Sequence, residues 1–395
     1  YFRMRVSLLL LVFLVCSDAH KILVYNIKFA HSHSNFIENI ADLLVDAGHD
    51  VTSLIPEISP HLQDGSTKTK VVRIPPHPEA AAANGRLYEG ELDMFSFSEL
   101  NPIIPIILGH EFATMFSKQC EATLDSSEIE KLQKEKFDVY ILESFDGCGM
   151  LLSHLLKPRA VIKASSTLLY FDHYDDFGVP QLLPFLPGPS SRSLDQHSLL
   201  SRAWNLYAET LMRLSSLPMR STVEELFRQR VCSDYPTLRE ISSNVAYVFT
   251  NTEPLIDFAT PTLTRLIEIG GLGAKEPQEL NEYWASVMGR RRKVVLISFG
   301  SVAKSHMMTP TGKAALHKVV SFFPSVTFIW KYEKKDEFAL GDAAKIDNLV
   351  LTDWMSQNDL LNHPNPICFH HSCRHGISAR ARDERETGDS RPYFR

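Results

Sequence analysis

The first residues that could do chemistry are two histidines, His31 and His33, in the stretch NIKFAHSHS (residues 26–34). The apolar run KILVY (residues 21–25) before it predicts a buried strand, so the stretch is expected to be a loop at the carboxyl edge of a sheet. Ligands of open α/β sheets bind at that edge, where a neutral histidine can take a proton from a hydroxyl group. We place His33 first as the candidate base. His31 is its competitor, and a loop histidine without a role is the alternative.

Two carboxylates could assist such a base. Glu143 and Asp146 follow FDVYIL (residues 137–142), which predicts a second buried strand. The carboxyl ends of neighbouring parallel strands meet at one edge of a sheet, so either acid could lie beside the histidine, fix its tautomer and stabilise the imidazolium. The pattern alone favours the alternative, a pair of solvated loop carboxylates.

A candidate phosphate-binding turn is SFGSV (residues 298–302). Gly300 permits close approach of a ligand to the backbone, and the N-terminus of the next helix offers free N–H groups. One glycine is weak evidence, because the stretch is neither a GxGxxG fingerprint nor a Walker loop. It is also not a GxSxG nucleophile elbow, which argues against a serine hydrolase. Trp354, after the strand pattern LVLTD, could stack on a base; a buried core tryptophan is the alternative.

The elements that must position these residues alternate between strands and helices, which predicts an α/β fold with parallel sheets built from βαβ units. An amphipathic helix from Phe36 to Ala47 belongs to a first unit that ends near Gly270. The alternation restarts at residue 293, after a linker at residues 270–292. Strand patterns lie at residues 21–25, 50–56, 137–142, 160–165, 245–251, 293–301, 326–332 and 349–354, and a further helix around residues 311–322.

Length, charge and cysteine content limit the class of protein. A chain of 395 residues suggests two domains, and a formal net charge of -6 argues against a protein that binds nucleic acid through its phosphates. Small molecules or proteins are therefore the expected partners. Cys120, Cys148 and Cys232 lie in the globular part; they form no disulfide scaffold, although an oxidising compartment would permit one bridge.

The N-terminus predicts a secretory signal peptide over residues 1–19. A basic start at Met4-Arg5 precedes the apolar run VSLLLLVFLV and a small-residue cleavage site, Ser17-x-Ala19. The run is shorter than the about 20 residues that a membrane span needs, so a cleaved signal is favoured over a retained anchor. The expected location is the secretory pathway, in the lumen or membrane of the endoplasmic reticulum, or outside the cell for a truncated chain.

Taken together, these stretches resemble the UDP-glycosyltransferases, specifically the UDP-glucuronosyltransferase-like enzymes of animals. The resemblance runs from about His20 to Asn365. It is most specific in PTLTRLIEIGGL and VVLISFGSVAKSHMM, and it includes SHSNF, AGHDVT, FDVYILESFDGCG and LTDWMSQNDLLNHP. The family implies a GT-B fold of two Rossmann-like domains, here an acceptor domain at residues 20–269 and an incomplete donor domain at residues 293–365.

The resemblance also implies an activity. A sugar, expected to be glucuronic acid, would pass from a UDP-sugar co-substrate to a small lipophilic acceptor with inversion and without a metal or other cofactor. His33 would be the general base and Glu143 its carboxylate partner, although the family usually has Asp at that position. The implied donor-binding residues are Gly300 and Ser301 at the diphosphate and Trp354 and Gln357 at the uracil.

The resemblance stops where the donor signature should continue. After NHPN the family has a strand and a glycine turn, roughly F-x-T-H-G-G-x-G-S, but this chain reads PICFHHSCRHGIS. Residues 369–378 can be written in codons that, read one nucleotide later, encode F-I-T-H-A-G-M-G-S. We therefore expect residues 366–395 to be an out-of-frame, disordered tail. The chain as written is expected to have little transferase activity and to lack the family's membrane anchor. The alternative is a secreted, non-enzymatic binder of small lipophilic molecules, which would not need to bind UDP.

Overall fold

A computed structural model of the chain describes residues 19–59, 61–62, 68–88, 95, 102–143, 145–167, 171–180, 197–255, 261–272, 277–300, 303–364 and 367–371. The chain divides into two compact units, residues 1–89 with 99–273 and residues 90–98 with 274–395. The division near residue 273 falls inside the linker predicted at residues 270–292. Ser301, most of the predicted tail and the predicted signal peptide, apart from Ala19, lie outside the described residues.

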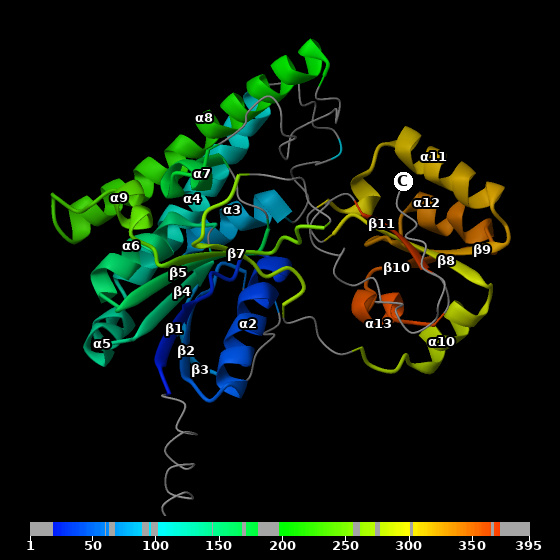
Figure 1. The fold of residues 1–395 in the computed structure, drawn as a ribbon. Helices are drawn as coiled ribbons and strands as arrows, with labels where there is room; N and C mark the ends of the chain where they lie inside the picture. Colours follow the sequence, from blue (N-terminus) through cyan, green and yellow to red (C-terminus); the bar gives the residue numbers. More distant parts are fainter. Residues whose placement is uncertain are drawn as a thin grey trace, which may run out of the picture. The chain divides into compact units, whose positions relative to one another are not determined.

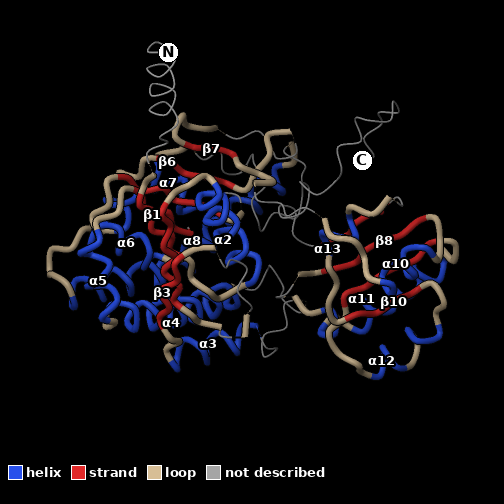
Figure 2. Tube along the Cα trace, turned by 90° about the horizontal axis from the view of Figure 1, so that it is seen from below, coloured by secondary structure: helices blue, strands red, loops and turns tan. Residues whose placement is uncertain are grey.

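The first unit is built on a seven-stranded parallel sheet with the order β3-β2-β1-β4-β5-β6-β7 (Figure 1). Its strands are β1 (Lys21–Tyr25), β2 (Asp50–Pro56), β3 (Lys70–Ile74), β4 (Val139–Glu143), β5 (Ala160–Ser165), β6 (Tyr247–Thr250) and β7 (Leu266–Glu268). Its helices are α2 (His31–Asp46), α3 (Pro78–Tyr88), α4 (Ile103–Leu124), α5 (Ser127–Glu135), α6 (Gly147–Leu156), α7 (Phe171–Phe177), α8 (Leu199–Arg230) and α9 (Leu238–Ser243). Figure 2 shows α2 on one face of this sheet and α5 and α6 on the other.

Apolar side chains at helical and strand spacing hold α2 against the sheet. Ile37 and Ile40 of α2 are buried with Ile22 and Val24 of β1 in one core cluster. The helix ends at Asp46 with Ala47 as its C-cap, and Gly48 directly after the cap has a φ of +92°. Glycine adopts this left-handed conformation without the steric cost that a Cβ atom brings. The first turn of α2, which carries the candidate base, is therefore part of a helix that is packed against the sheet.

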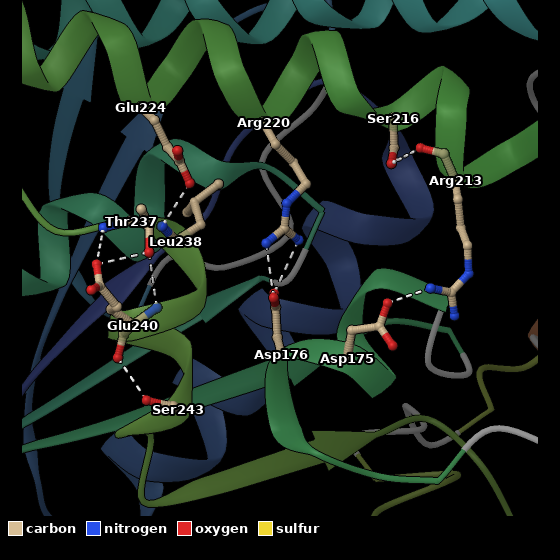
Figure 3. Close-up of polar contacts among 10 residues, drawn as sticks. All are labelled: Asp175, Asp176, Arg213, Ser216, Arg220, Glu224, Thr237, Leu238, Glu240 and Ser243. Atoms are coloured by element: carbon tan, nitrogen blue, oxygen red, sulfur yellow. Dashed lines mark hydrogen bonds and ion pairs between the residues drawn. The ribbon is translucent and has the colours of Figure 1, made fainter.

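A set of polar contacts fixes the helices that follow β5 (Figure 3). Arg220 on α8 donates to both carboxylate oxygens of Asp176 on α7, at 3.1 and 2.8 Å. The Asp176 side chain is only 4% exposed, so this is a largely buried ion pair. One turn further along α8, Glu224 accepts a hydrogen bond of 2.8 Å from the backbone N–H of Leu238, at the start of α9. These contacts tie α7, the first helix after β5, to the long helix α8.

The second unit is a four-stranded parallel sheet with the order β10-β9-β8-β11. Its strands are β8 (Lys293–Ser298), β9 (Val326–Lys331), β10 (Leu349–Thr352) and β11 (Ile367–His371). Its helices are α10 (Glu282–Gly289), α11 (Pro310–Phe322), α12 (Glu337–Leu340) and α13 (Gln357–Leu361), with the 3₁₀ turns η1 (Ser305–Met307) and η2 (Ala343–Lys345). The core includes Leu296 of β8 and Ile329 of β9, which are fully buried.

Strand β11 differs from the prediction that the folded part ends at Asn365. Residues 367–371 pair in parallel with β8, with Phe369 opposite Leu296 in the register. Without this strand, β8 would present an unpaired edge of backbone N–H and C=O groups, which favours addition of a strand. The sheet therefore extends past Asn365, into the segment that was expected to be a disordered tail.

The described part of the first unit contains one disulfide. Cys120 of α4 and Cys148 of α6 are joined, with a Cα–Cα distance of 5.7 Å, and Cys232 is an exposed free thiol. The sequence analysis allowed for one disulfide among these three cysteines without assigning its partners.

The helices that the structure describes include none that is both long enough and apolar enough to cross a bilayer.

Candidate active site

His33 lies in the first turn of α2 and not in a loop. The prediction that the helix begins at Phe36 is wrong, because α2 begins at His31, directly after its N-cap residue Ala30. The polar stretch HSHS gives no apolar face to predict a helix, but it can form the first turn at the sheet edge, where side chains need no core contact. The side chain of His33 is 14% exposed.

Glu143 is the last residue of β4 and lies beside His33. Strands β1 and β4 are hydrogen-bonded neighbours with Tyr25 opposite Leu142, so their carboxyl ends share one edge. The distance from Nδ1 of His33 to Oε1 of Glu143 is 3.3 Å. The structure therefore brings together the two residues that the sequence proposed as base and carboxylate partner. His31 points to a different contact, with its Nδ1 3.1 Å from Nδ2 of Asn35.

Ser166 completes this group and was not predicted. Its hydroxyl lies 2.7 Å from Nδ1 of His33 and donates to Oε1 of Glu143 at 3.0 Å. Ser166 directly follows β5, which pairs with β4 so that Ala164 lies opposite Glu143. The available signal was a polar residue directly after the strand pattern at residues 160–165, whose carboxyl end reaches the same edge. Without the strand order, that signal could not be distinguished from any other serine after a strand.

Glu143 is held in its ionised form although it is buried. Burial raises the pKa of its carboxyl group, but the His33 ring and two backbone N–H groups outweigh burial and hold the pKa below its usual range. The N–H of Phe145 donates to Oε2 at 2.7 Å, and that of Ser166 donates to Oε1 at 3.3 Å. The site therefore has a fixed negative charge that can stabilise a protonated His33.

Asp146, the other acid considered from the sequence, has a different environment. It is the N-cap residue of α6 and accepts a hydrogen bond of 2.7 Å from the hydroxyl of Tyr25. Burial, with a smaller contribution from the nearby charge of Glu143, raises the pKa of Asp146 to about 7 against the lowering effect of the Tyr25 hydrogen bond. The two carboxyl groups are thus shifted in opposite directions, and Glu143 is the one that contacts the histidine.

Aromatic rings enclose His33. The ring centroids of Phe29 and Phe145 lie 4.8 and 5.0 Å from that of the His33 ring. Phe116 packs against both phenylalanines and is fully buried. Such a wall lowers the local dielectric and strengthens the interaction between His33 and Glu143.

The second unit holds the predicted donor residues Gly300 and Gln357 close to one serine. Gly300 follows β8 and has a φ of +86°, a conformation that a residue with a Cβ atom rarely adopts. Its N–H donates to Oγ of Ser298 at 3.3 Å, and Nε2 of Gln357 donates to the same oxygen at 2.9 Å. Ser298 therefore joins the turn after β8 to the first residue of α13, which the sequence did not indicate.

Trp354 follows β10 at the carboxyl edge of this sheet and is 59% exposed, so it is not a buried core tryptophan. Ser301 lies outside the described residues, and its prediction stays untested. A residue that the sequence missed is Lys331, at the end of β9. Its ammonium group donates to the carbonyl oxygen of Gly300 at 2.9 Å and to Glu333 at 3.1 Å.

The sequence pattern of one family matches residues 20–379, nearly the whole chain; its description is "UDP-glucoronosyl and UDP-glucosyl transferase". The chain belongs to this family. Among its relatives, the putative UDP-glucuronosyltransferase ugt-48 of Caenorhabditis elegans is 28% identical over 357 residues, covering 89% of this chain and 68% of the relative. UDP-glucuronosyltransferase 1A8 of Rattus norvegicus is 25% identical over 360 residues, covering 88% and 64% respectively.

Solved structures show the fold of this family member. The glycosyltransferase SnogD of Streptomyces nogalater has a TM-score of 0.52 at 13% identity, covering 92% of this chain and 79% of that protein. Os79 of O. sativa, solved with U2F and trichothecene, has a TM-score of 0.55 at 14% identity, covering 91% and 78%. The predicted GT-B fold, with two Rossmann-like units, is confirmed.

Proposed function

We propose that the chain transfers a sugar, glucuronic acid first among the candidates, from a UDP-sugar to a hydroxyl group of a small lipophilic acceptor, with inversion at the sugar. Family membership makes the chain an enzyme of the hexosyltransferase type. The observation that carries the proposal is the group of His33, Ser166 and Glu143 at the carboxyl edge of the first sheet. A histidine with a buried, ionised partner is suited to act as a general base.

In the proposed step, Nε2 of His33 takes the proton of the acceptor hydroxyl. The acceptor oxygen forms a bond to C1 of the sugar, and the bond from C1 to the UDP oxygen breaks, so UDP leaves with the electron pair. Attack from the face opposite UDP inverts C1. Glu143, which is fully buried, stabilises the imidazolium that forms, and the aromatic rings around His33 suit an apolar acceptor.

The donor half of the proposal concerns the second unit. The turn at Gly300 and Ser301 would receive the diphosphate on backbone N–H groups, and the exposed Trp354 would stack on uracil with Gln357 beside it. Stabilisation of the leaving diphosphate by backbone groups removes the need for a metal ion, so the proposed reaction uses none. Chelation by EDTA should accordingly leave the rate unchanged.

The proposed compartment is the secretory pathway. The Cys120–Cys148 disulfide supports this, because such bridges persist in oxidising compartments and are rare in the cytosol. The predicted signal peptide at residues 1–19 supports the same location. Tryptic mapping of protein from secreting cells should recover a peptide pair linked through Cys120 and Cys148.

The decisive experiment measures UDP release from UDP-glucuronic acid and UDP-glucose, with a phenol and a steroid alcohol as acceptors. Mass spectrometry identifies the conjugate, and NMR of its anomeric proton shows inversion. A variant that replaces residues 369–378 with F-I-T-H-A-G-M-G-S should release UDP, and the chain as written should release it more slowly. Absence of both UDP binding and release in the two proteins would overturn the proposal. Binding of the acceptors without UDP would instead support a non-enzymatic binder.

A further inference from the structure

We infer that Ser166 is a positioning residue: its hydroxyl accepts the Nδ1 proton of His33, donates its own proton to Glu143, and so keeps Nε2 of His33 free to accept a proton. The inference rests on the proposed function, because it assigns a role within that same site. Ser166 lies nearer to the ring of His33 than Glu143 does. The distance from Nδ1 to the Ser166 hydroxyl is 2.7 Å, against 3.3 Å to Glu143.

Counting protons gives the direction of each hydrogen bond. Oγ of Ser166 lies within bonding distance of two groups, Nδ1 of His33 at 2.7 Å and Oε1 of Glu143 at 3.0 Å, and it has one proton to give. Were that proton directed at Nδ1, two oxygen atoms with lone pairs would face each other at 3.0 Å with no hydrogen between them. An ionised Glu143 makes that arrangement unfavourable. The proton therefore lies toward Glu143, and Nδ1 must carry the other one.

The backbone around Ser166 is fixed from two sides. Its N–H donates to Oε1 of Glu143 at 3.3 Å, and its carbonyl oxygen accepts from Nδ2 of Asn251 at 3.0 Å. The N–H of Asn251 in turn donates to the carbonyl oxygen of Ser165 at 3.0 Å. Ser166 is thus held by the ends of β4 and β6, the two neighbours of β5. A hydroxyl on this support can hold one tautomer of the histidine without adjustment at each turnover.

The test compares Ser166→Ala with Ser166→Thr, which keeps a hydroxyl, in the full chain. Ser153→Ala is the matched control, because Ser153 is also a buried serine that donates to a carbonyl oxygen, that of Met150 at 2.6 Å, away from His33. The first readout is the tautomer of His33, from long-range ¹H–¹⁵N NMR of protein labelled at histidine, with the His33 signals assigned by their loss in His33→Gln. The second is kcat and KM with saturating UDP-sugar.

We expect His33 of the unchanged protein to carry its proton on Nδ1. Ser166→Ala should shift the population toward the Nε2–H tautomer and lower kcat by roughly tenfold or more with little change in KM, since the substituted group touches no substrate. Ser166→Thr should restore both properties, and Ser153→Ala should change neither. The inference is overturned if His33 of the unsubstituted protein carries its proton on Nε2. It is also overturned if Ser166→Ala changes neither the tautomer of His33 nor kcat. The NMR measurement needs no turnover, so failure of the transferase proposal would not hide its result.

Discussion

At the scale of single residues, the structure separates two histidines that the sequence could not. His33 contacts Glu143 and Ser166, whereas His31 contacts Asn35 on its own helix. We therefore expect His33→Ala to lower kcat/KM by about 10²–10⁴-fold, the usual contribution of a general base. His31→Ala is the control and should change it by less than about threefold. A comparable loss in both variants would show that the first turn of α2, and not the His33 ring, is what matters.

Asp146 makes a second residue-scale prediction, in the pH dependence of stability. Its pKa rises from 3.8 to about 7 on burial, so the folded protein binds the proton more tightly than the unfolded chain. The contribution of this group to stability is therefore full below about pH 4 and is lost as the pH rises through about 7. The Asp146→Asn side chain cannot ionise. Its free energy of unfolding should therefore increase relative to that of the unsubstituted protein as the pH rises.

Urea titrations at several pH values across that window would check this. Tyr25→Phe provides the complementary variant, because the Tyr25 hydroxyl bonds to Asp146 and lowers its pKa. Without that hydroxyl, the loss of stability should move to higher pH. Parallel pH profiles for Asp146→Asn and the unchanged protein would show that Asp146 does not titrate in this range.

The sequence predicted the site only as far as residue types at strand ends allow. His33 and Glu143 could be proposed because each follows a buried-strand pattern, and all carboxyl ends of a parallel sheet share an edge. Ser166 could not, because its place depends on β5 lying beside β4, and no local pattern encodes strand order. Lys331 was missed for a related reason: its contact with Gly300 joins the end of β9 to the turn after β8.

At the scale of elements, buried strands were the most predictable feature and exposed edge strands the least. Residues 21–25 and 326–331 form the buried strands β1 and β9 where the apolar runs placed them. Strand β3 is largely exposed and β7 has three residues, so neither leaves an apolar run to detect. Helix α4 begins at Ile103 with a proline on either side of its start. Pro102 is its N-cap and Pro105 lies in its first turn, where proline is tolerated.

The Arg220–Asp176 ion pair makes the prediction at this scale, because it ties α7 to α8 (Figure 3). Arg220→Ala would leave the Asp176 carboxylate buried without its partner, and we expect a loss of about 3–5 kcal/mol in the free energy of unfolding. Arg230→Ala is the matched control on the same helix. Its pairs with Glu121 and Asp125 are more exposed, and their loss should cost about 1 kcal/mol or less. Equal losses in denaturant titrations would show that burial of the pair does not decide its contribution.

At the scale of the whole molecule, the proposed base and the proposed donor-binding residues belong to different compact units. His33 lies in the first, and Gly300, Trp354 and Gln357 lie in the second. Substitutions in the first unit should therefore affect turnover, and substitutions in the second unit should affect UDP binding. His33→Ala should lower turnover by about 10²–10⁴-fold and leave the affinity for UDP unchanged. Trp354→Ala should weaken UDP binding by about 1–3 kcal/mol, roughly 5- to 150-fold, because an exposed indole ring that stacks on a base contributes that much.

Calorimetric titration of UDP into the full chain would measure this, with Phe322→Ala as the control. Phe322 is another exposed aromatic residue of the second unit, 77% exposed against 59% for Trp354. It ends α11, which leaves the carboxyl end of β8 and returns to the start of the parallel strand β9, so it lies toward the opposite edge of the sheet. Loss of affinity in Trp354→Ala alone would assign the uracil to the carboxyl edge. Unchanged affinity in that variant would remove Trp354 from the donor site and leave Gly300 and Gln357 as the residues to test.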